Sequence, residues 1–154
     1  METRVEVRAT ETADRAAVLA LASRLEIGMS PWRDREAVAR TVRNWIEASL
    51  DAEDDTRASF VAAEDGVVVG FVSVEEQDHW SGDPEAYIGE LIVADDREGR
   101  GIGRALVERA AAWGRERGRC RIALDTGAGN ERALAFYRAI GFDHDEVRLS
   151  RALT

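Results

Sequence analysis

The hydrophobic and polar positions of the chain repeat with a period of about two residues in some stretches and about three to four in others. The short period is typical of half-buried strands and the longer one of amphipathic helices. Ile102, Leu106, Ala110 and Trp113, for example, share one stripe of a helix. In chain order the pattern predicts a strand over 4–9, helices over 12–26 and 34–50, strands over 57–64, 67–76 and 86–94, a helix over 100–118, a strand over 120–126, a helix over 130–141 and a strand from Val147.

Cap and turn residues support these boundaries. Thr12 and Asn130 can cap the helices that they begin, and Gly141 can end the last helix. Asp65 and Gly66 predict a tight hairpin, because both central positions of such a turn need positive φ. The order β-α-α-β-β-β-α-β-α-β therefore predicts an α+β fold, in which helices lie on the faces of a mixed sheet.

Composition narrows the class of protein. The 154 residues suit a single domain over 1–154, and no apolar run approaches the length of a membrane span. Residues 1–5 lack the basic and apolar regions of a secretory signal, so we expect a cytoplasmic protein. One cysteine and two histidines exclude a disulfide framework and a closed zinc site, so we expect no metal.

The net charge of −9 bears on possible partners. Binding to a phosphate backbone needs clustered Lys and Arg, so we expect no nucleic-acid partner. An acidic surface attracts cations, which makes amines and polyamines plausible ligands, although the same charge could serve only solubility.

The stretch REGRGIGRAL, residues 97–106, places Gly99, Gly101 and Gly103 where a helix begins. The first N–H groups of a helix attract anions, and glycines allow a phosphate to approach the backbone. A P-loop is excluded, because no Lys followed by Ser or Thr comes after the last glycine. Beside a phosphate cradle, two alternatives stay open: a dinucleotide site with Asp125 as its ribose-binding acid, and a purely structural turn.

Asn130 and Tyr137 lie two turns apart on the last predicted helix, so they share a face and stand about 10.5 Å apart along its axis. Together with the glycine loop they resemble the GNAT superfamily of acyl-CoA-dependent N-acyltransferases, and the element order resembles it over nearly the whole chain. The loop resembles the family pattern Gln/Arg-x-x-Gly-x-Gly/Ala. The second motif, Asn-x-x-Ala-x-x-Phe-Tyr-x-x-x-Gly-Phe, is matched by Asn130, Ala133, Phe136, Tyr137, Gly141 and Phe142.

The resemblance implies a largely antiparallel sheet and a site for acetyl-CoA. Backbone amides of the glycine loop are implied to bind the pyrophosphate, and the strand before it to pair with the pantetheine arm. The implied cofactor-binding residues are Leu91, Ile92, Val93, Gly99, Arg100, Gly101, Ile102, Gly103, Arg104 and Asn130. The Tyr137 hydroxyl is implied to protonate the leaving thiolate, although an aromatic residue at this spacing also suits core packing.

Glu98 departs from the family pattern, which begins with Gln or Arg at that position. A carboxylate beside a pyrophosphate is repelled by it, so we expect Glu98 to point outward or to pair with an arginine. The backbone cradle does not depend on this side chain.

Acyl transfer to an amine also needs a proton acceptor, either a side chain or a water chain. Alternation along the strand over 86–94 places Glu90 on one face with Ile88 and Ile92, opposite Tyr87. These apolar neighbours should raise the pKa of Glu90 into a useful range for a base. The alternative is a half-exposed carboxylate in a salt bridge.

We expect the acceptor pocket to lie between the break after the first helix and the loop before the strand over 86–94. The break supplies Ser30, Pro31 and Trp32, and the loop supplies His79 and Trp80. Their rings can contact an amine or its apolar part, but they can equally seal the edge of a core. His79 is a second candidate base or an ordinary loop residue.

These features predict an N-acetyltransferase that moves an acetyl group from acetyl-CoA directly to a primary amine, with a polyamine or an aminoglycoside as the favoured acceptor. The alternatives are an acetyltransferase of protein N-termini or lysines and a non-catalytic acyl-CoA-binding sensor. We expect no membrane partner, and the resemblance allows a homodimer.

Overall fold

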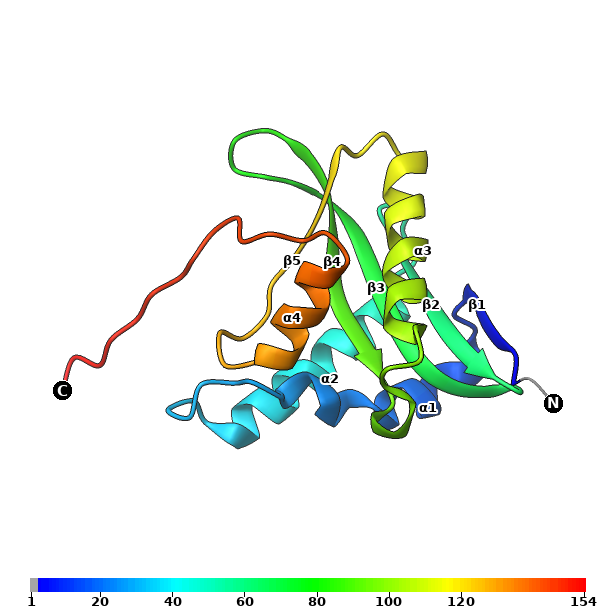
Figure 1. The fold of residues 1–154 in the computed structure, drawn as a ribbon, viewed down its shortest axis with the longest axis horizontal. Coiled ribbons are helices and arrows are strands. Elements are labelled where there is room, and N and C mark those ends of the chain that lie inside the picture. The colour runs from blue at the N-terminus through cyan, green and yellow to red at the C-terminus, as the bar shows by residue number, and fades with distance from the viewer. Residues whose placement is uncertain (1–2) are drawn as a thin grey trace.

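A computed structural model describes residues 3–154, so Met1 and Glu2 of the expected domain lie outside the described part. The centre of that part is a five-stranded sheet in the order β1-β2-β3-β4-β5 (Figure 1). Neighbouring strands are antiparallel, except that β4 and β5 are parallel. The strands are β1 (Val5–Ala9), β2 (Arg57–Glu64), β3 (Val67–Asp78), β4 (Pro84–Val93) and β5 (Arg121–Leu124). The predicted α+β fold with a mixed, largely antiparallel sheet is confirmed.

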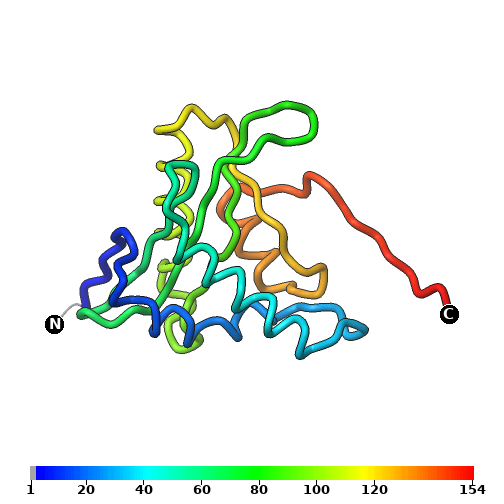
Figure 2. Tube along the Cα trace, turned by 180° about the vertical axis from the view of Figure 1, so that it is seen from behind, coloured from blue at the N-terminus to red at the C-terminus, as the bar shows by residue number. Residues whose placement is uncertain are grey.

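Helices cover both faces of this sheet (Figures 1 and 2). One face carries α1 (Arg15–Ala20) and α2 (Arg35–Asp51), and the other carries α3 (Ile102–Glu116) and α4 (Glu131–Ala139). The shorter 3₁₀ segments are η1 (Thr12–Asp14), η2 (Ala22–Glu26) and η3 (Asp95–Arg97). α3 is the crossover that a parallel pair such as β4 and β5 requires. Within residues 3–154, no helix has both the length and the apolar character needed to cross a membrane.

Two apolar clusters fix the helices to the sheet. On one face Val18 of α1 and Ile46 of α2 pack against Phe71 of β3, and all three are fully buried. On the other face the stripe predicted for α3 is confirmed, its buried members being Ile102, Leu106, Ala110 and Trp113. Burying one side chain of the size of leucine contributes about 1.5–3 kcal/mol, so these stripes hold the helices against the strands that carry the site.

Three of the turn and cap predictions are confirmed. Asp65 and Gly66 form the β2–β3 turn with φ values of 50° and 84°. Asn130 caps α4, because its side-chain oxygen accepts a hydrogen bond from the Ala133 N–H at 3.2 Å. Gly141 follows α4 with a φ of 102°, the left-handed conformation expected of a helix end.

The helix predicted over 12–26 is wrong in its continuity and in its cap. The segment is divided into η1, α1 and η2, and Thr12 caps none of them. Instead the carboxylate of Asp14 accepts the Glu11 N–H at 2.8 Å and pairs with Arg8 of β1 at 2.8 Å. This tertiary ion pair fixes the first turn, so the α-helix begins only after it.

The strand predicted from Val147 is also absent from the structure. Residues 143–154 are exposed and have no regular secondary structure, and they extend away from the sheet (Figures 1 and 2). An alternating pattern indicates which face a strand would bury, but a strand is stable only beside a neighbour. In the described part of the chain, no strand lies beside this segment.

Candidate active site

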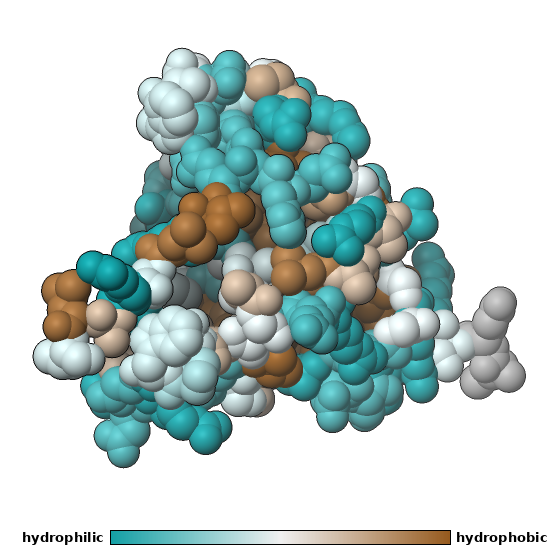
Figure 3. All heavy atoms as spheres, turned by 60° about the vertical axis from the view of Figure 1, so that its left-hand side comes forward, coloured by the Kyte–Doolittle hydropathy of each residue, from teal (hydrophilic) through white to brown (hydrophobic). Residues whose placement is uncertain are grey.

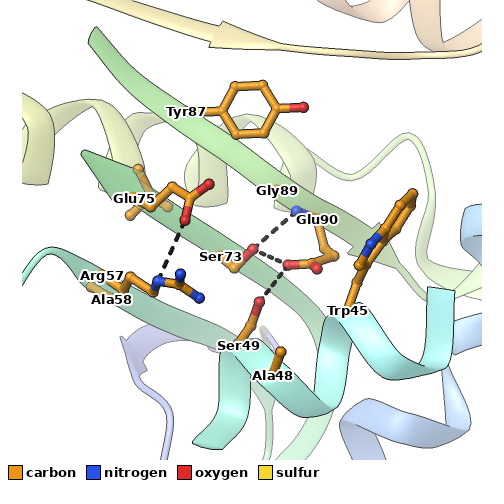
Figure 4. Close-up of a pocket in the computed structure, with 11 residues that line it drawn as sticks. Trp45, Ala48, Ser49, Arg57, Ala58, Ser73, Glu75, Tyr87, Gly89 and Glu90 are labelled. Carbon is orange, nitrogen blue, oxygen red and sulfur yellow. Dashed lines mark hydrogen bonds and ion pairs between the residues drawn. The ribbon is translucent and has the colours of Figure 1, made fainter. Parts of the chain in front are cut away.

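A pocket of about 360 Å³ lies between α2 and the strands β2, β3 and β4 (Figure 4). This volume is in the range of small-molecule sites. Its lining residues are Trp45, Ala48, Ser49, Arg57, Ala58, Ser73, Val74, Glu75, Tyr87, Gly89 and Glu90. Of the two residues predicted to be catalytic, Glu90 lines this pocket and Tyr137 does not.

An irregularity in β4 decides where Glu90 points. The register to β3 shifts so that Gly89 and Glu90 together lie opposite Ser73, as in a β-bulge. The extra residue reverses the alternation: Ile88 packs in the core on the α3 side, whereas Glu90 faces α2. The prediction that Glu90 shares a face with Ile88 and opposes Tyr87 is therefore wrong, since Tyr87 lines the same pocket.

Glu90 is a buried carboxylate with two hydroxyl partners and an exposed fraction of only 4%. It accepts a hydrogen bond from Ser49 at 2.9 Å and another from Ser73 (Figure 4). The Ser73 oxygen also accepts the backbone N–H of Glu90 at 3.0 Å. Burial raises the pKa of Glu90, and the two serine hydroxyls partly oppose that rise. The carboxylate is thus held in one orientation and is more basic than an exposed one.

Replacing Glu90 by Gln should stabilise the folded protein at neutral pH and have little effect at acid pH. Because burial raises the pKa of this carboxyl above its ordinary value of 4.5, the wild-type protein loses stability as the pH rises through the raised value. Below the ordinary value both the folded and the unfolded chain hold the proton, so that loss is absent. Glutamine stays neutral, and the gain in melting temperature should widen from about pH 4 to pH 8.

Glu108→Gln, at an exposed site on α3, is the control for this experiment. Its melting temperature should differ from that of the wild type by a small amount at every pH. A Glu90→Gln difference that stays constant with pH would contradict the desolvated state of this carboxylate.

The rest of the pocket combines polar and aromatic side chains with small apolar ones. Arg57 of β2 pairs with Glu75 of the neighbouring strand β3 at 3.4 Å, and the indole of Trp45 lies beside Glu90 (Figure 4). The Tyr87 hydroxyl donates to Asp125 at 2.6 Å, and burial raises the pKa of Tyr87. The Asp125 carboxylate therefore accepts a hydrogen bond from a side chain that lines the pocket. A dinucleotide site would need this carboxylate to bind a ribose, so the main support for such a site is removed.

Sequence reasoning missed the serines that orient Glu90. Ser73 does leave a signal, because it is a hydroxyl inside the apolar run VVVGFVSVEE, and a buried hydroxyl needs a partner. Ser49 follows Val42 and Trp45 at the spacing of one helix face, which carries a similar hint. Neither signal identifies Glu90 as the partner, since that pairing joins residues of three different elements.

The glycine loop leaves the start of α3 open. Gly99 and Gly101 have φ values of 76° and 82°, which glycine adopts without strain. Gly101 precedes α3 and no side chain caps this helix start, so its first N–H groups are left for another acceptor. A Cβ built on either glycine would meet no atom within 4 Å. The loop therefore fits an anion such as a pyrophosphate.

Glu98 pairs with two arginines from opposite sides of the loop. Its partners are Arg24 of η2 and Arg132 of α4, the second at 2.6 Å. The expectation that Glu98 pairs with an arginine is confirmed. Arg97, one residue earlier, pairs with Glu64 of β2. The loop is thus tied by ion pairs to both helical layers and to the sheet.

β4 and β5 separate along their length. Their pairing covers only Glu85–Ile88 of β4, which continues to Val93. On that side the residues 89–93 have no strand partner in the described part of the chain. The segment predicted to bind pantetheine, Leu91, Ile92 and Val93, lies within this unpaired length. Backbone groups on such an edge can pair with an extended ligand.

The two predicted residues of α4 have different surroundings. Asn130 caps the helix and also donates from its side-chain amide to the Ile27 carbonyl at 3.4 Å. Tyr137 packs between Phe136 and Phe142, with ring centroids 5.2 and 5.5 Å away. Burial raises the pKa of Tyr137 to about 12. Its hydroxyl has no hydrogen-bond partner within residues 3–154.

The residues predicted to contact the acceptor lie outside the pocket. Trp80 donates to the Glu146 carboxylate at 2.6 Å, and a ring nitrogen of His79 lies 2.9 Å from the same oxygen. This contact raises the pKa of His79. Trp32, just before α2, is exposed. A substrate role for Trp32, His79 and Trp80 stays a prediction. Across residues 3–154, His, Cys, Asp and Glu side chains form no group of three or more that could hold a metal ion.

Several solved structures with a similar fold are acetyltransferases. The fold matches an aminoglycoside N-acetyltransferase in complex with CoA at a TM-score of 0.73 and 20% identity, over 100% of this chain and 98% of that one. It also matches glucosamine-6-phosphate N-acetyltransferase from Arabidopsis thaliana, at a TM-score of 0.67 and 17% identity, over 98% of this chain and 99% of that one. In sequence, residues 20–142 match the acetyltransferase (GNAT) family. The chain belongs to this family.

Curated relatives cover shorter parts of the chain. It is 34% identical over 105 residues to an aminoglycoside N(6')-acetyltransferase type 1 of Stenotrophomonas maltophilia, which is 65% of this chain and 69% of that protein. It is 37% identical over 97 residues to an uncharacterized N-acetyltransferase of Methanocaldococcus jannaschii, covering 60% and 42%. It is 32% identical over 132 residues to mycothiol acetyltransferase of Rhodococcus jostii, covering 79% and 39%. The chain thus spans about two fifths of the length of the last two.

Proposed function

We propose that this chain is an N-acetyltransferase that transfers the acetyl group of acetyl-CoA directly to a primary amine of a small cationic molecule, such as a polyamine or an aminoglycoside. The observation that carries the proposal is the buried Glu90, whose raised pKa suits a base, in the wall of a pocket of small-molecule size. We take residues 1–154 as one cytoplasmic domain with this activity.

Glu90 is the group that receives the proton of the amine. An alkyl ammonium ion is the main form at neutral pH, with an ordinary pKa near 10.4 in lysine, and only the neutral amine attacks a carbonyl carbon. Ser49 and Ser73 hold the carboxylate toward the pocket. The proton of the amine passes to Glu90 directly if the amine reaches the carboxylate in the pocket, and through a water chain if it binds farther away.

Acetyl-CoA would supply the activated acetyl group, and three features of the chain fit it. The uncapped start of α3 with Gly99 and Gly101 suits the pyrophosphate. The unpaired edge of β4 at residues 89–93 suits the amides of the pantetheine arm. Tyr137 is protonated at neutral pH, as an ordinary tyrosine is, and burial raises its pKa further, so its hydroxyl can donate a proton to the departing thiolate.

The pocket walls favour an acceptor that is cationic and partly apolar. Glu75 and Glu90 contribute carboxylates, and Trp45 contributes an aromatic face on which an ammonium group or a sugar ring can lie. The overall charge of −9 attracts such molecules over a longer range. The aminoglycoside acetyltransferases among the relatives support the same class of acceptor.

The experiment that tests the proposal measures thiol release from acetyl-CoA in the presence of polyamines, aminoglycosides, amino acids and N-terminal peptides. We expect turnover with at least one polyamine or aminoglycoside and acetylation of its amine by mass spectrometry. Turnover with peptides alone would assign a protein acceptor. If no amine is acetylated while acetyl-CoA still raises the melting temperature, the chain is a binding module and the proposal fails.

Replacing Glu98 by Gln should tighten the binding of acetyl-CoA by roughly two- to tenfold, because it removes a negative charge beside the proposed pyrophosphate site. The same change removes the ion pairs to Arg24 and Arg132, so we expect it to cost up to about 1 kcal/mol of stability. Calorimetric titration and thermal unfolding measure the two effects. Glu108→Gln removes the same charge from the exposed side of α3 and should alter neither; an equal gain in affinity there would point to net charge alone.

A further inference from the structure

The pocket that contains Glu90 holds more negative than positive charge. Its charged lining residues are Glu75, Glu90 and Arg57. The Glu90 carboxylate has two hydroxyl partners and forms no ion pair within residues 3–154. Arg57 is shared by two carboxylates, because its Nε lies 3.4 Å from Glu75 and 3.9 Å from Asp54. When Glu90 is ionised, the described chain therefore leaves two negative charges without a counterion here, one at Glu90 and one in the group around Arg57.

The strand β3 sets the distance between the two carboxylates of the pocket. Glu75 lies two residues after Ser73, and Ser73 binds the Glu90 carboxylate. β3 is regular at this point, since Ser73 and Glu75 pair in register with Ser59 and Arg57 of β2. Side chains two residues apart on a strand share a face and are about 7 Å apart. Two cations bound by Glu75 and Glu90 would therefore be separated by about 7 Å.

Glu75 can bind a second cation and keep its ion pair with Arg57. That pair uses the Oε2 atom, and within residues 3–154 the Oε1 atom accepts no hydrogen bond. The Glu75 side chain is 36% exposed, so a ligand in the pocket can reach it. Tyr87 lies across from Glu75 on β4, and Trp45 lies beside Glu90 (Figure 4). Their rings offer apolar surface to the methylene groups between two charges.

A doubly charged acceptor also suits the molecule as a whole. Hydrophilic residues make up most of the face shown in Figure 3. The net charge of −9 attracts a dication more strongly than a monocation. An acceptor with a carboxylate, by contrast, would have to compete with Glu75 and Asp54 for Arg57.

We propose that Glu75 determines the acceptor specificity of this pocket by binding a second ammonium group while the first reaches Glu90. The acceptor is then a diamine whose primary amines are about 7 Å apart. A saturated chain extends by about 1.2 Å per bond, so roughly four or five carbon atoms between the amines span this distance. Only the amine at Glu90 gives up a proton, and the ammonium group at Glu75 serves in binding alone. This inference rests on the proposed function, which leaves the choice among amines open.

Calorimetric titration in the presence of CoA tests the inference without turnover. The two ligands are putrescine and its amino-alcohol analogue, in which a hydroxyl replaces one of the terminal amines. The wild type should bind putrescine about tenfold more tightly, because only putrescine brings a second charge to Glu75. Glu75→Gln should remove most of this preference and change the affinity for the amino alcohol little. Equal binding of the two ligands, no binding of putrescine, or a preference that survives Glu75→Gln overturns the proposal.

Glu76→Gln is the matched control. Glu76 is the next residue on β3, faces the other side of the sheet and pairs with Arg117 and Arg119. Its replacement removes the same charge from the same strand, so it should keep the tenfold preference for putrescine. Loss of the preference in both variants would assign it to net charge and overturn the role of Glu75.

Arg57 provides the opposite test. Arg57→Gln should tighten the binding of putrescine by roughly two- to fivefold, because the guanidinium no longer shares the Glu75 carboxylate. γ-Aminobutyrate, which replaces the second amine by a carboxylate, should bind no more tightly than the amino alcohol. If it binds more tightly and Arg57→Gln removes that gain, Arg57 selects an anionic acceptor and the proposal is overturned.

Rates with acetyl-CoA distinguish this inference from the proposed function. If putrescine binds with the expected preference but no amine is acetylated, the proposed function fails while the role of Glu75 in binding stands. If the diamine and the amino alcohol are acetylated with equal kcat/KM, the proposed function holds and the diamine specificity is overturned. A higher kcat/KM for the diamine that Glu75→Gln removes supports both.

Discussion

Glu90→Gln should lower kcat/KM for the amine acceptor by roughly a hundredfold or more, because the variant cannot accept a proton at this position. The wild-type rate should rise with pH as Glu90 loses its proton, over a range above the ordinary glutamate value because burial raises the pKa. The amine acceptor also titrates, but its protonation affects the wild type and the variant equally. Dividing the wild-type rate by the variant rate at each pH, with the same acceptor, therefore removes this contribution. That ratio should increase as the pH rises through the raised pKa of Glu90, above the ordinary glutamate value, and then level off.

Glu85→Gln is the matched control for this experiment. Glu85 is also a buried carboxylate on β4, with an exposed fraction of 3%, but it does not line the pocket. Its loss should leave the shape of the pH profile unchanged. If Glu90→Gln likewise keeps the wild-type profile, Glu90 is not the base, and another side chain or a water chain accepts the proton. The gain in stability expected for the same variant shows whether its fold is intact when the rate is lost.

Tyr137→Phe should lower kcat for thiol release by about a hundredfold while changing the KM for acetyl-CoA little. The hydroxyl has no partner in residues 3–154, so its removal keeps the ring packed between Phe136 and Phe142 and the melting temperature unchanged. The pKa of about 12 keeps the hydroxyl protonated at neutral pH, which is the state that a proton donor requires. Steady-state kinetics with a saturating acceptor measure the effect.

Tyr87→Phe is the comparison for that variant, since Tyr87 is the other tyrosine of the chain. Tyr87 lines the proposed acceptor pocket and its hydroxyl donates to Asp125, so the loss of this hydroxyl should raise the KM for the amine more than it lowers kcat. A loss of kcat in Tyr137→Phe and a rise in KM in Tyr87→Phe would thus distinguish a proton donor to the thiolate from a residue that shapes the acceptor site. Equal losses of kcat in both would contradict the role proposed for Tyr137.

Local patterns predicted much of the fold. The α3 stripe, the Asp65–Gly66 hairpin and the Asn130 cap each depend on residues within a few positions of one another, and the structure confirms all three. The helix over 12–26 failed because a tertiary pair, Arg8 with Asp14, sets where the α-helix begins. The helix propensities of neighbouring residues do not predict that contact.

The features of the candidate site were likewise predictable where they are local and not predictable where they depend on distant segments. The glycine loop could be found from spacing, because a helix start with glycines has a local anion-binding geometry. The pairing of Glu98 with an arginine could be expected, but not its partners Arg24 and Arg132, which come from distant segments. The pocket lies between α2, β2, β3 and β4, and not at the predicted loops with Trp32 and Trp80. Which surfaces enclose a cavity depends on how the layers pack.

The sequence by itself determined the family, the order of the main helices and strands as far as α4, the glycine loop and the identity of Glu90 and Tyr137 as candidates. These features follow from the spacing of residues along one segment, which the chain carries in any conformation. The tertiary structure alone decided that a bulge turns Glu90 toward α2, that Ser49 and Ser73 hold it, and that residues 147–154 join no strand within residues 3–154. Each of these depends on register and contact between segments distant in sequence, which no local pattern encodes.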